Sequence, residues 1–500
     1  MKYSNPEISW HNRDPVLSID FQPQSSDGLL RLATGGSQGN DPSEIHVIVM
    51  WSVTVGQNGA GSVEFLCELN RHEKSVNAVR FSPNGEMLGS ADDGGIIMIW
   101  MHNHDWKPKS DFSDFSAEKD SEIKIKEQWT VSKVLRGHMG DVCDMCWSPD
   151  GSKLLSGSVD NTAILWDVIK GKRIQLLSEQ EGFVQGVAWD PKNKFVATLS
   201  SDRSCRVYSL MTNKEVKTIC SVLIKNADGE EKPNQIFHDD TLMTFCRRLN
   251  FSPDGRILFA PCGLLELDEV ATTDDSESTK KKIYTTYAFV RYDDFSKPVA
   301  YYPSYDGYSV SVRCCPILFE LQPGQPSLYD IPYRMIFVVA TEKSILLYDT
   351  QEKEPFARIS RIHYTRLTDV AWSSNGRILV VSSMDGYCSI VTFSDGELGK
   401  PYETVKCVEE AVSPNLPSSF QPLLQGEIFK KNVQPVIDDE DFHLAYEVNE
   451  MTPDTPAAPC PPTHSTLNSE CSTAQESPKC VNVRNSPRRV KLVTLSSPKK

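Results

Sequence analysis

The sequence predicts an all-β fold, a seven-bladed β-propeller followed by a disordered C-terminal tail, and three observations lead to this prediction. A pattern of residues recurs with a fixed internal spacing, most copies contain an Asp-Gly or Asn-Gly turn, and the pattern stops at about residue 398. Residues 1–398 are therefore expected to form the propeller. Residues 399–500, rich in Pro, Ser, Thr and Asn without hydrophobic periodicity, are expected to form the tail.

The repeat is clearest where His138 and Trp166, 28 residues apart, enclose the turn Trp147-Ser-Pro-Asp-Gly151. The same spacing occurs in three more copies, from His72 to Trp100, from Gln180 to Tyr208 and from His363 to Val391. Asp-Gly and Asn-Gly favour the tight turn between adjacent antiparallel strands. Since one small sheet cannot bury both of its faces, several must stack radially, as they do in a WD-type propeller.

Three weaker copies bring the count to seven, a common size for a closed ring. The first runs from His11 to Trp51, the fifth contains Phe251-Ser-Pro-Asp-Gly255, and the sixth lies between Val299 and Asp349. Each is lengthened or altered relative to the clear copies, so its position follows from strand-like patterning and not from the full motif.

Two further features concern the ring as a whole. Polar insertions at 102–128, 221–239 and 267–282 are expected on the surface. The seventh copy ends after its third strand, which would leave an open sheet edge. Residues 3–10 are therefore expected to supply the outer strand of the last blade, beside residues 387–393.

Within the clearest copy, four polar or aromatic positions are expected to form one hydrogen-bonded cluster in the interior of the blade. They are the loop residue His138, the turn residue Asp160, a strand serine (Ser156 or Ser158) and Trp166. Because they follow the repeat register, their role is predicted to be structural and not catalytic or ligand-binding.

Composition places the chain among soluble intracellular proteins. The apolar share of 39% and charged share of 24% are ordinary, no apolar run is long enough to cross a bilayer, and the N-terminus lacks the apolar stretch of a secretory signal. We therefore expect no membrane partner and reduced thiols. The net charge of -15 disfavours strong direct DNA binding by the propeller and suits a basic partner.

Fragments that imitate catalytic or metal sites have simpler explanations. The GxSxG pattern at 35–39 lies where a propeller strand enters its turn, and His102 and His104 lack further ligands at a suitable spacing. Cys143 and Cys146 are three apart in a strand, so they point to opposite faces. We predict no catalytic residue, no cofactor and no metal, and hence a non-enzymatic scaffold that holds other proteins together.

Eight runs of residues, spread over nearly the whole propeller, include several that the repeat does not require. They are Glu7-Ile-Ser-Trp-His-Asn12, Asp160-Asn-Thr-Ala-Ile-Leu-Trp-Asp167, Val184-Gln-Gly-Val-Ala-Trp-Asp-Pro191, Val196-Ala-Thr-Leu-Ser200, Phe237-His-Asp-Asp240, Arg313-Cys-Cys-Pro316, Leu346-Leu-Tyr-Asp-Thr350 and Asp385-Gly-Tyr-Cys-Ser389. Together they resemble the WD-repeat middle subunit of chromatin assembly factor 1, the replication-coupled histone chaperone, a family related to HIRA.

A second resemblance lies in the tail, in Ser486-Pro-Arg-Arg-Val-Lys-Leu-Val-Thr-Leu495. It is similar to the short segment by which this subunit and HIRA engage the antisilencing-function histone chaperone, which carries histones H3 and H4. Val490 stands where isoleucine is usual and Thr494 where proline is common, and both keep the apolar or extended character. The resemblance implies a partner-binding site formed by Arg488, Arg489, Val490, Leu492 and Leu495.

The resemblance implies a nuclear subunit that helps to deposit histones H3 and H4 on newly replicated DNA. Its expected partners are the large and small subunits of chromatin assembly factor 1, the antisilencing-function chaperone and the histones, touched directly or through other subunits. Two alternatives stay open. A WD-repeat substrate receptor of a ubiquitin ligase would use the same fold, and a solvated basic end or part of a nuclear import signal would explain the charges of the tail.

The tail also offers sites for proline-directed phosphorylation, although Ser-Pro and Thr-Pro pairs are common in any disordered segment. The candidate residues each precede a proline and are Ser413, Thr452, Thr455, Ser477, Ser486 and Ser497. A phosphate on Ser486 would lie beside two arginines of the predicted docking segment, and we expect it to weaken docking to an acidic partner.

Overall fold

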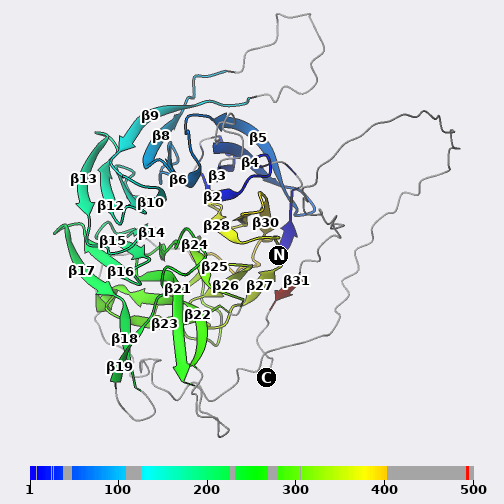
Figure 1. The fold of residues 1–500 in the computed structure, drawn as a ribbon. Helices are drawn as coiled ribbons and strands as arrows, with labels where there is room; N and C mark the ends of the chain where they lie inside the picture. Colours follow the sequence, from blue (N-terminus) through cyan, green and yellow to red (C-terminus); the bar gives the residue numbers. More distant parts are fainter. Residues whose placement is uncertain are drawn as a thin grey trace, which may run out of the picture. The chain divides into compact units, whose positions relative to one another are not determined.

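The computed structural model describes residues 1–402 and the backbone of residues 491–494. Within the first range it leaves out Glu7, Ser9, Gln24, Ser26, Tyr305, 38–47, 108–124, 226–230 and 269–279. The described residues form a ring of seven antiparallel sheets, the blades, numbered here in chain order (Figure 1). The predicted all-β, seven-bladed propeller is confirmed. Of the predicted tail, residues 399–402 and 491–494 are described.

In each of the first four blades the strands follow one another along the chain, from the centre of the ring to its rim (Figure 1). The strands of blades 1 and 2 are β2 (Val16–Phe21), β3 (Arg31–Gly36), β4 (Ile48–Val55), β5 (Gly61–Leu69), β6 (Val76–Phe81), β7 (Met87–Asp92), β8 (Ile96–His102) and β9 (Trp129–Arg136). Those of blades 3 and 4 are β10 (Val142–Trp147), β11 (Lys153–Ser158), β12 (Ala163–Asp167), β13 (Lys172–Leu177), β14 (Val184–Trp189), β15 (Phe195–Ser200), β16 (Cys205–Ser209) and β17 (Lys214–Ile219).

Blades 5 and 6 contain the longest described strands, and blades 7 and 6 contain the first and the last described strand of the chain. Blades 5 and 6 consist of β20 (Asn250–Phe251), β21 (Ile257–Asp268), β22 (Lys280–Val290), β23 (Pro298–Pro303), β24 (Ser309–Phe319), β25 (Arg334–Thr341), β26 (Ser344–Asp349) and β27 (Ala357–Ser360). Blade 7 consists of β28 (Leu367–Trp372), β29 (Ile378–Ser383), β30 (Cys388–Thr392) and β1 (Lys2–Ser4), and one further strand, β31 (Lys491–Thr494), pairs with blade 6.

Two of the predicted insertions contain ordered strands. The insertion at 221–239 forms a hairpin of β18 (Ser221–Lys225) and β19 (Glu231–Gln235), which pair antiparallel. The insertion at 267–282 begins and ends within the long pair of β21 and β22, with Asp268 opposite Lys280. Strand β22 therefore begins at Lys280, inside the predicted insertion.

The Ser-Pro-Asp-Gly turns of blades 3 and 5 explain why the inner strand reverses there into the next strand. Ser148 Oγ lies 2.5 Å from Asp150 Oδ1 and accepts the backbone N–H of Lys153 at 2.9 Å. Gly151 has a φ of 69°, a left-handed conformation that glycine adopts without steric cost. The same side-chain contact recurs between Ser252 and Asp254 at 2.5 Å. The repeated motif therefore fixes the same turn in different blades.

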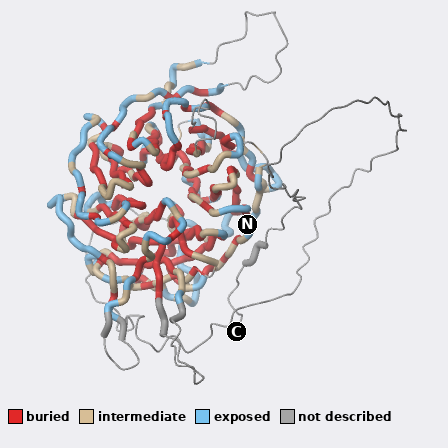
Figure 2. Tube along the Cα trace, viewed as in Figure 1, coloured by how far each residue is buried: buried red, intermediate tan, exposed pale blue. Residues whose placement is uncertain are grey.

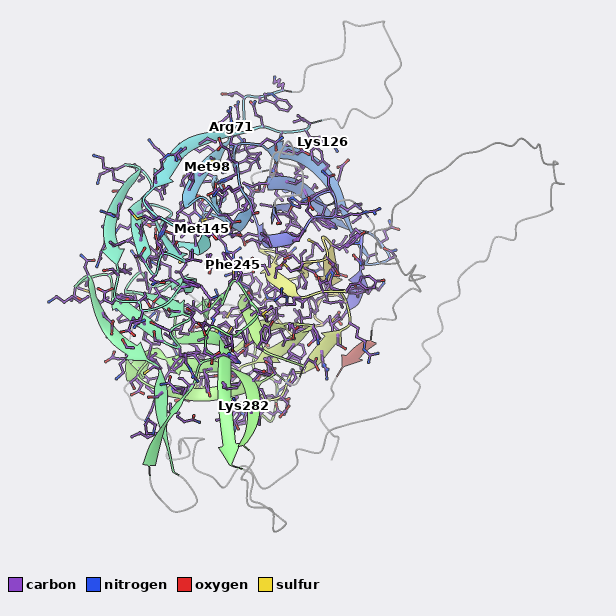
Figure 3. The ribbon with its side chains drawn as sticks, in the orientation of Figure 1. Arg71, Met98, Lys126, Met145, Phe245 and Lys282 are labelled. Carbon is purple, nitrogen blue, oxygen red and sulfur yellow. The ribbon has the colours of Figure 1, made fainter. Side chains whose placement is uncertain are left out.

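The hydrophobic core is divided into seven clusters, and each cluster combines residues of neighbouring blades. Figure 2 shows this buried material inside the ring and exposed residues along the rim. Figure 3 shows Met145 toward the centre, whereas Arg71 and Lys126 lie toward the rim. Each blade thus buries both of its faces only because it has a neighbour on each side.

The ring closes through the two ends of the propeller sequence. β1 pairs antiparallel with β30, with Tyr3 opposite Val391. The closure was predicted for residues 3–10, but the strand is Lys2–Ser4, since Pro6 lacks the N–H that a strand needs. Trp10, 1% exposed, instead packs in the core between blades 7 and 1.

Candidate protein-interaction site

The four residues of the predicted WD cluster meet inside blade 3. His138 Nδ1 lies 3.0 Å from Asp160 Oδ2, and His138 Nε2 lies 2.8 Å from Ser156 Oγ. Trp166 Nε1 donates to the same Ser156 Oγ at 2.8 Å. Ser158, the other serine considered, instead accepts the backbone N–H of Asp160 at 3.1 Å. The cluster links the loop before the blade to its turn and its third strand, which is a structural function.

Other blades contain an equivalent cluster, built in some of them from other residue types. Blade 2 has the same set, His72, Ser90, Asp92 and Trp100. In blade 4, Gln180 Nε2 donates to Thr198 Oγ1 and contacts Tyr208 Oη, both at 2.9 Å. In blade 7, His363 contacts Ser389 Oγ at 2.9 Å, and Tyr3 of β1 contacts the same hydroxyl at 3.0 Å. The N-terminal strand therefore joins the polar cluster of the blade that it completes.

The surroundings within these clusters shift the pKa values of Asp160 and His11. Burial raises the pKa of Asp160, but the hydrogen bonds from His138, Thr162 and a backbone N–H outweigh it, so the pKa lies below its ordinary value. In blade 1 the equivalent histidine, His11, contacts Thr34 Oγ1 at 2.8 Å. Burial lowers the pKa of His11 to about 4, so this histidine is neutral at physiological pH.

A second polar network, which was not predicted from the sequence, lies on or beside the inner strands around the centre of the ring. Arg80 Nη1 lies 2.9 Å from Asp369 Oδ2, and its Nη2 lies 3.3 Å from Asp144 Oδ1. Arg248 Nε lies 3.4 Å from the same Asp144 oxygen. All four side chains are at most 7% exposed. Ion pairs at close range, in a region of low solvent access, therefore join blades 2, 3, 5 and 7.

The repeat register contained a signal for this network. Asp144, Arg248 and Asp369 all stand three residues before the aromatic residue that ends the inner strand, and Arg80 stands one residue before it. Charged residues in a strand that is otherwise buried need partners. Burial raises the pKa of Asp369, but the charges of Arg248 and Arg80 outweigh it, so this pKa lies below its ordinary value.

The fragments that imitate enzyme or metal sites lie on ordinary strands and turns where they are described. Gly35 and Gly36 end β3, while residues 38–39 of the GxSxG pattern lie outside the described residues. His102 ends β8 and its Nδ1 lies 3.0 Å from His104 Nδ1. Within the described parts of the chain, three or more His, Cys, Asp or Glu residues nowhere gather in a group that could hold a metal ion. Nor does any helix there have the length and apolarity to span a bilayer.

The described part of the predicted docking segment pairs with the propeller itself. β31 runs antiparallel to β27, the outer strand of blade 6, with Leu492 opposite Ile359 and Lys491 opposite Ser360 (Figure 1). The tail sequence predicts an extended segment that adds to the sheet edge of a partner. Pairing of the segment with an edge of the same chain was not predicted.

The remaining residues of the predicted site lie outside the described residues. These are four of the five partner-binding residues, Arg488, Arg489, Val490 and Leu495, and the six candidate phosphorylation sites, Ser413, Thr452, Thr455, Ser477, Ser486 and Ser497. Their roles stay predictions. The residues just after the expected end of the propeller are described, and Tyr402 donates its backbone N–H to Leu318 O of β24 at 2.8 Å.

Comparison with known proteins agrees with this architecture over the whole ring. The model of the CAF1B/HIR1 beta-propeller domain matches residues 1–398. The B subunit of chromatin assembly factor 1 from Mus musculus is 42% identical over 412 residues, which cover 80% of this chain and 68% of the relative. The corresponding protein of Saccharomyces cerevisiae is 32% identical over 417 residues, which cover 78% of this chain and 86% of the relative. Protein HIR1 of Candida albicans is more distant, at 29% identity over 67% of this chain and 34% of that protein. With seven blades closed by its N-terminal strand and a match over the entire ring, this chain belongs to the family of the chromatin assembly factor 1 B subunits.

Proposed function

We propose that this chain is the scaffold subunit of a replication-coupled histone chaperone, chromatin assembly factor 1, which helps to deposit histones H3 and H4 on newly replicated DNA. The observation that carries the proposal is the family match over residues 1–398, which spans all seven blades. A chain of this family is a non-catalytic subunit. Its place of action is the nucleus, where chromatin is assembled.

The ring suits a scaffold because its blades are held together at two levels. Seven apolar clusters join neighbouring blades, and the ion pairs of Arg80 and Arg248 join blades across the centre. Such a platform presents its rims and loops to the large and small subunits with little rearrangement. The net charge of -15 complements strongly basic histones, whether the chain touches them directly or through the other subunits.

The tail is proposed to dock the antisilencing-function chaperone. Residues 481–500 hold six Lys or Arg and no acidic residue, against the acidic balance of the whole chain. Val490 and Leu492 alternate in the way an extended strand needs to place both on one face. Arg488 and Arg489 can pair bidentately with carboxylates of the partner, and Leu495 extends the apolar contact.

The test of this function is the set of proteins that accompany the chain in dividing cells. A tagged full-length chain should copurify with the large and small subunits, the antisilencing-function chaperone and histones H3 and H4, as identified by mass spectrometry. Copurification with ubiquitin ligase adaptors in place of histones would overturn the proposal in favour of a substrate receptor. A variant with Arg488→Ala and Arg489→Ala should lose the chaperone alone.

A further inference from the structure

We propose that the outer edge of blade 6, strand β27, is a docking site for residues Lys491–Thr494 of the same chain, and that this pairing competes with docking of the segment on the antisilencing-function chaperone. The first part stands on the pairing of β31 with β27. The second part rests on the proposed function of the tail. Together they describe a segment with two alternative sheet edges, one in its own propeller and one in a partner.

Blade 6 is the one five-stranded sheet among the described residues, and its outer strand differs from those of blades 3, 4 and 5. Lysine and proline on an outer strand discourage pairing with a further strand. β13 begins with Lys172, β17 contains Lys214 and Lys217, and β23 begins and ends with Pro298 and Pro303. Nearly all residues of β17 are exposed, as the rim of the ring in Figure 2 illustrates.

β27 lacks these features. Its sequence is Ala-Arg-Ile-Ser, in which Ala357 and Ile359 are buried at 2% and 0% exposure. Its one charged side chain, Arg358, forms an ion pair with Asp306, which also accepts a hydrogen bond from Ser344 Oγ at 2.7 Å. The charge that could repel a basic segment is therefore balanced within the blade. The outer edge of β27 therefore carries backbone N–H and C=O groups that can pair with a further strand.

The described chain also brings the docking segment back to the blade from which the tail departs. Tyr402 lies beside β24 of blade 6, where its backbone N–H donates to Leu318 O, and its ring lies 5.4 Å from that of Tyr333. The 88 residues 403–490 connect it to β31. A tether of this length gives an effective concentration below about 1 mM, so a four-residue pairing is readily reversible. A chaperone with micromolar or stronger affinity can displace it.

The two pairings exclude each other because both use the same four residues. Neighbouring strands lie about 4.8 Å apart, so two folded proteins cannot lie against opposite edges of so short a segment without colliding. Only chains whose segment is not paired with β27 can bind the chaperone. The apparent affinity of the full chain therefore equals the intrinsic affinity multiplied by the fraction of chains with a free segment.

The test uses a charge change at Ser360, which the register places opposite Lys491. Ser360→Lys sets like charges directly opposite each other and should weaken the pairing, whereas Ser360→Glu should strengthen it. Hydrogen exchange of residues 357–360 in the full chain should become several-fold faster in the first variant and slower in the second. Thr218→Lys, on the exposed outer strand of blade 4, is the matched control and should change nothing at 357–360.

Equal exchange at 357–360 in all four proteins would overturn docking on blade 6, whatever the chaperone does. Exchange that depends on protein concentration would show that a second copy supplies the strand, which would overturn docking within one chain. Calorimetry with the chaperone should then give an affinity a few-fold higher for Ser360→Lys than for Ser360→Glu. Equal affinities would overturn competition, and absence of binding by every variant, with exchange changed as expected, would contradict the proposed tail function but not the docking on β27.

Discussion

The two ends of the chain both add a strand to the outer edge of a blade, but with different consequences. β1 is the fourth strand of blade 7, which would otherwise have three. β31 is a fifth strand on blade 6, whose other four already form a complete blade. Antiparallel pairing at a sheet edge is therefore part of the fold where it completes a blade, and we propose that it is exchangeable where it only extends one.

The largest difference between the two ends should appear in stability. Trp10, which follows β1, packs with its ring centroid 4.9 Å from that of Trp51. Trp10→Ala should lower the free energy of unfolding by about 3–5 kcal/mol, because it leaves a cavity between blades 7 and 1. Leu492→Ala in β31 should lower it by less than about 0.5 kcal/mol. Urea unfolding measures both, and similar losses would contradict the comparison.

Acid should lower the stability of the folded chain through protonation of His11, which lies near the N-terminal end. Its pKa of about 4 in the folded chain lies below the ordinary 6.5, so the unfolded chain binds more protons between these values. Stability should therefore fall as the pH drops from 6.5 toward 4, by up to about 3 kcal/mol. His11→Gln, which copies Gln180 of blade 4, should remove this part of the pH dependence. An unchanged acid slope of the unfolding free energy in that variant would refute the assignment.

Blades 3 and 6 differ in what holds their strands together, because blade 6 lacks the polar cluster. By strand register, Tyr348 takes the place of Trp166 and Val339 that of Ser156. The hydroxyl of Tyr348 donates to Pro303 O at 2.6 Å, and the ring of Phe337 stacks on Tyr348 with centroids 5.5 Å apart. Aromatic packing therefore substitutes for the hydrogen-bonded cluster.

Asp160→Ala should accordingly destabilise the protein by about 1–3 kcal/mol, since it leaves His138 and the backbone N–H of Met139 without their acceptor. Lys343→Ala, at the equivalent position of blade 6, should change stability by less than about 0.5 kcal/mol because this side chain is exposed. Chemical denaturation of the two variants tests whether blade 6 is stable without a polar cluster equivalent to that of blade 3. A larger loss for the lysine variant would show that it is not.

These blades also show how far the sequence could predict the fold. Ser-Pro-Asp-Gly turns and the spacing from His138 to Trp166 identified the clear blades, because a turn and a hydrogen-bonded cluster need particular residues. Blade 6 was recognised only from two adjacent apolar strands, since Val339 and Tyr348 replace the polar signals. The hairpin of β18 and β19 was missed because its sequence has no strand periodicity of its own.

The candidate site was predictable to a smaller extent. The tail segment was found by resemblance, and its extended character matches the backbone of β31. Its partner strand could not be predicted, because an edge is defined by what other strands leave uncovered and not by a motif in β27. The ion pairs of Arg80 and Asp369 join residues 289 apart, a separation at which sequence gives no pairing rule.

The smallest expected effect is a change in chaperone binding by the tail when Ser486 is phosphorylated. A phosphate on Ser486 would add negative charge beside Arg488 and Arg489 and should weaken chaperone binding several-fold. The measurement compares peptides of residues 473–500 that carry a phosphate on Ser486 or, as the control, on Ser477. If the two phosphopeptides bind equally well, the proposed switch at Ser486 is lost.

Whether the tail is a docking segment can be measured by calorimetry of a peptide covering residues 481–500 with the antisilencing-function chaperone. Binding energy in such segments rests on a few anchors, each worth about 1–3 kcal/mol. The native peptide should therefore bind, and a peptide with Arg488→Ala and Arg489→Ala should bind at least about tenfold more weakly. Equal affinity of the two peptides, or no binding by the native one, would contradict the account.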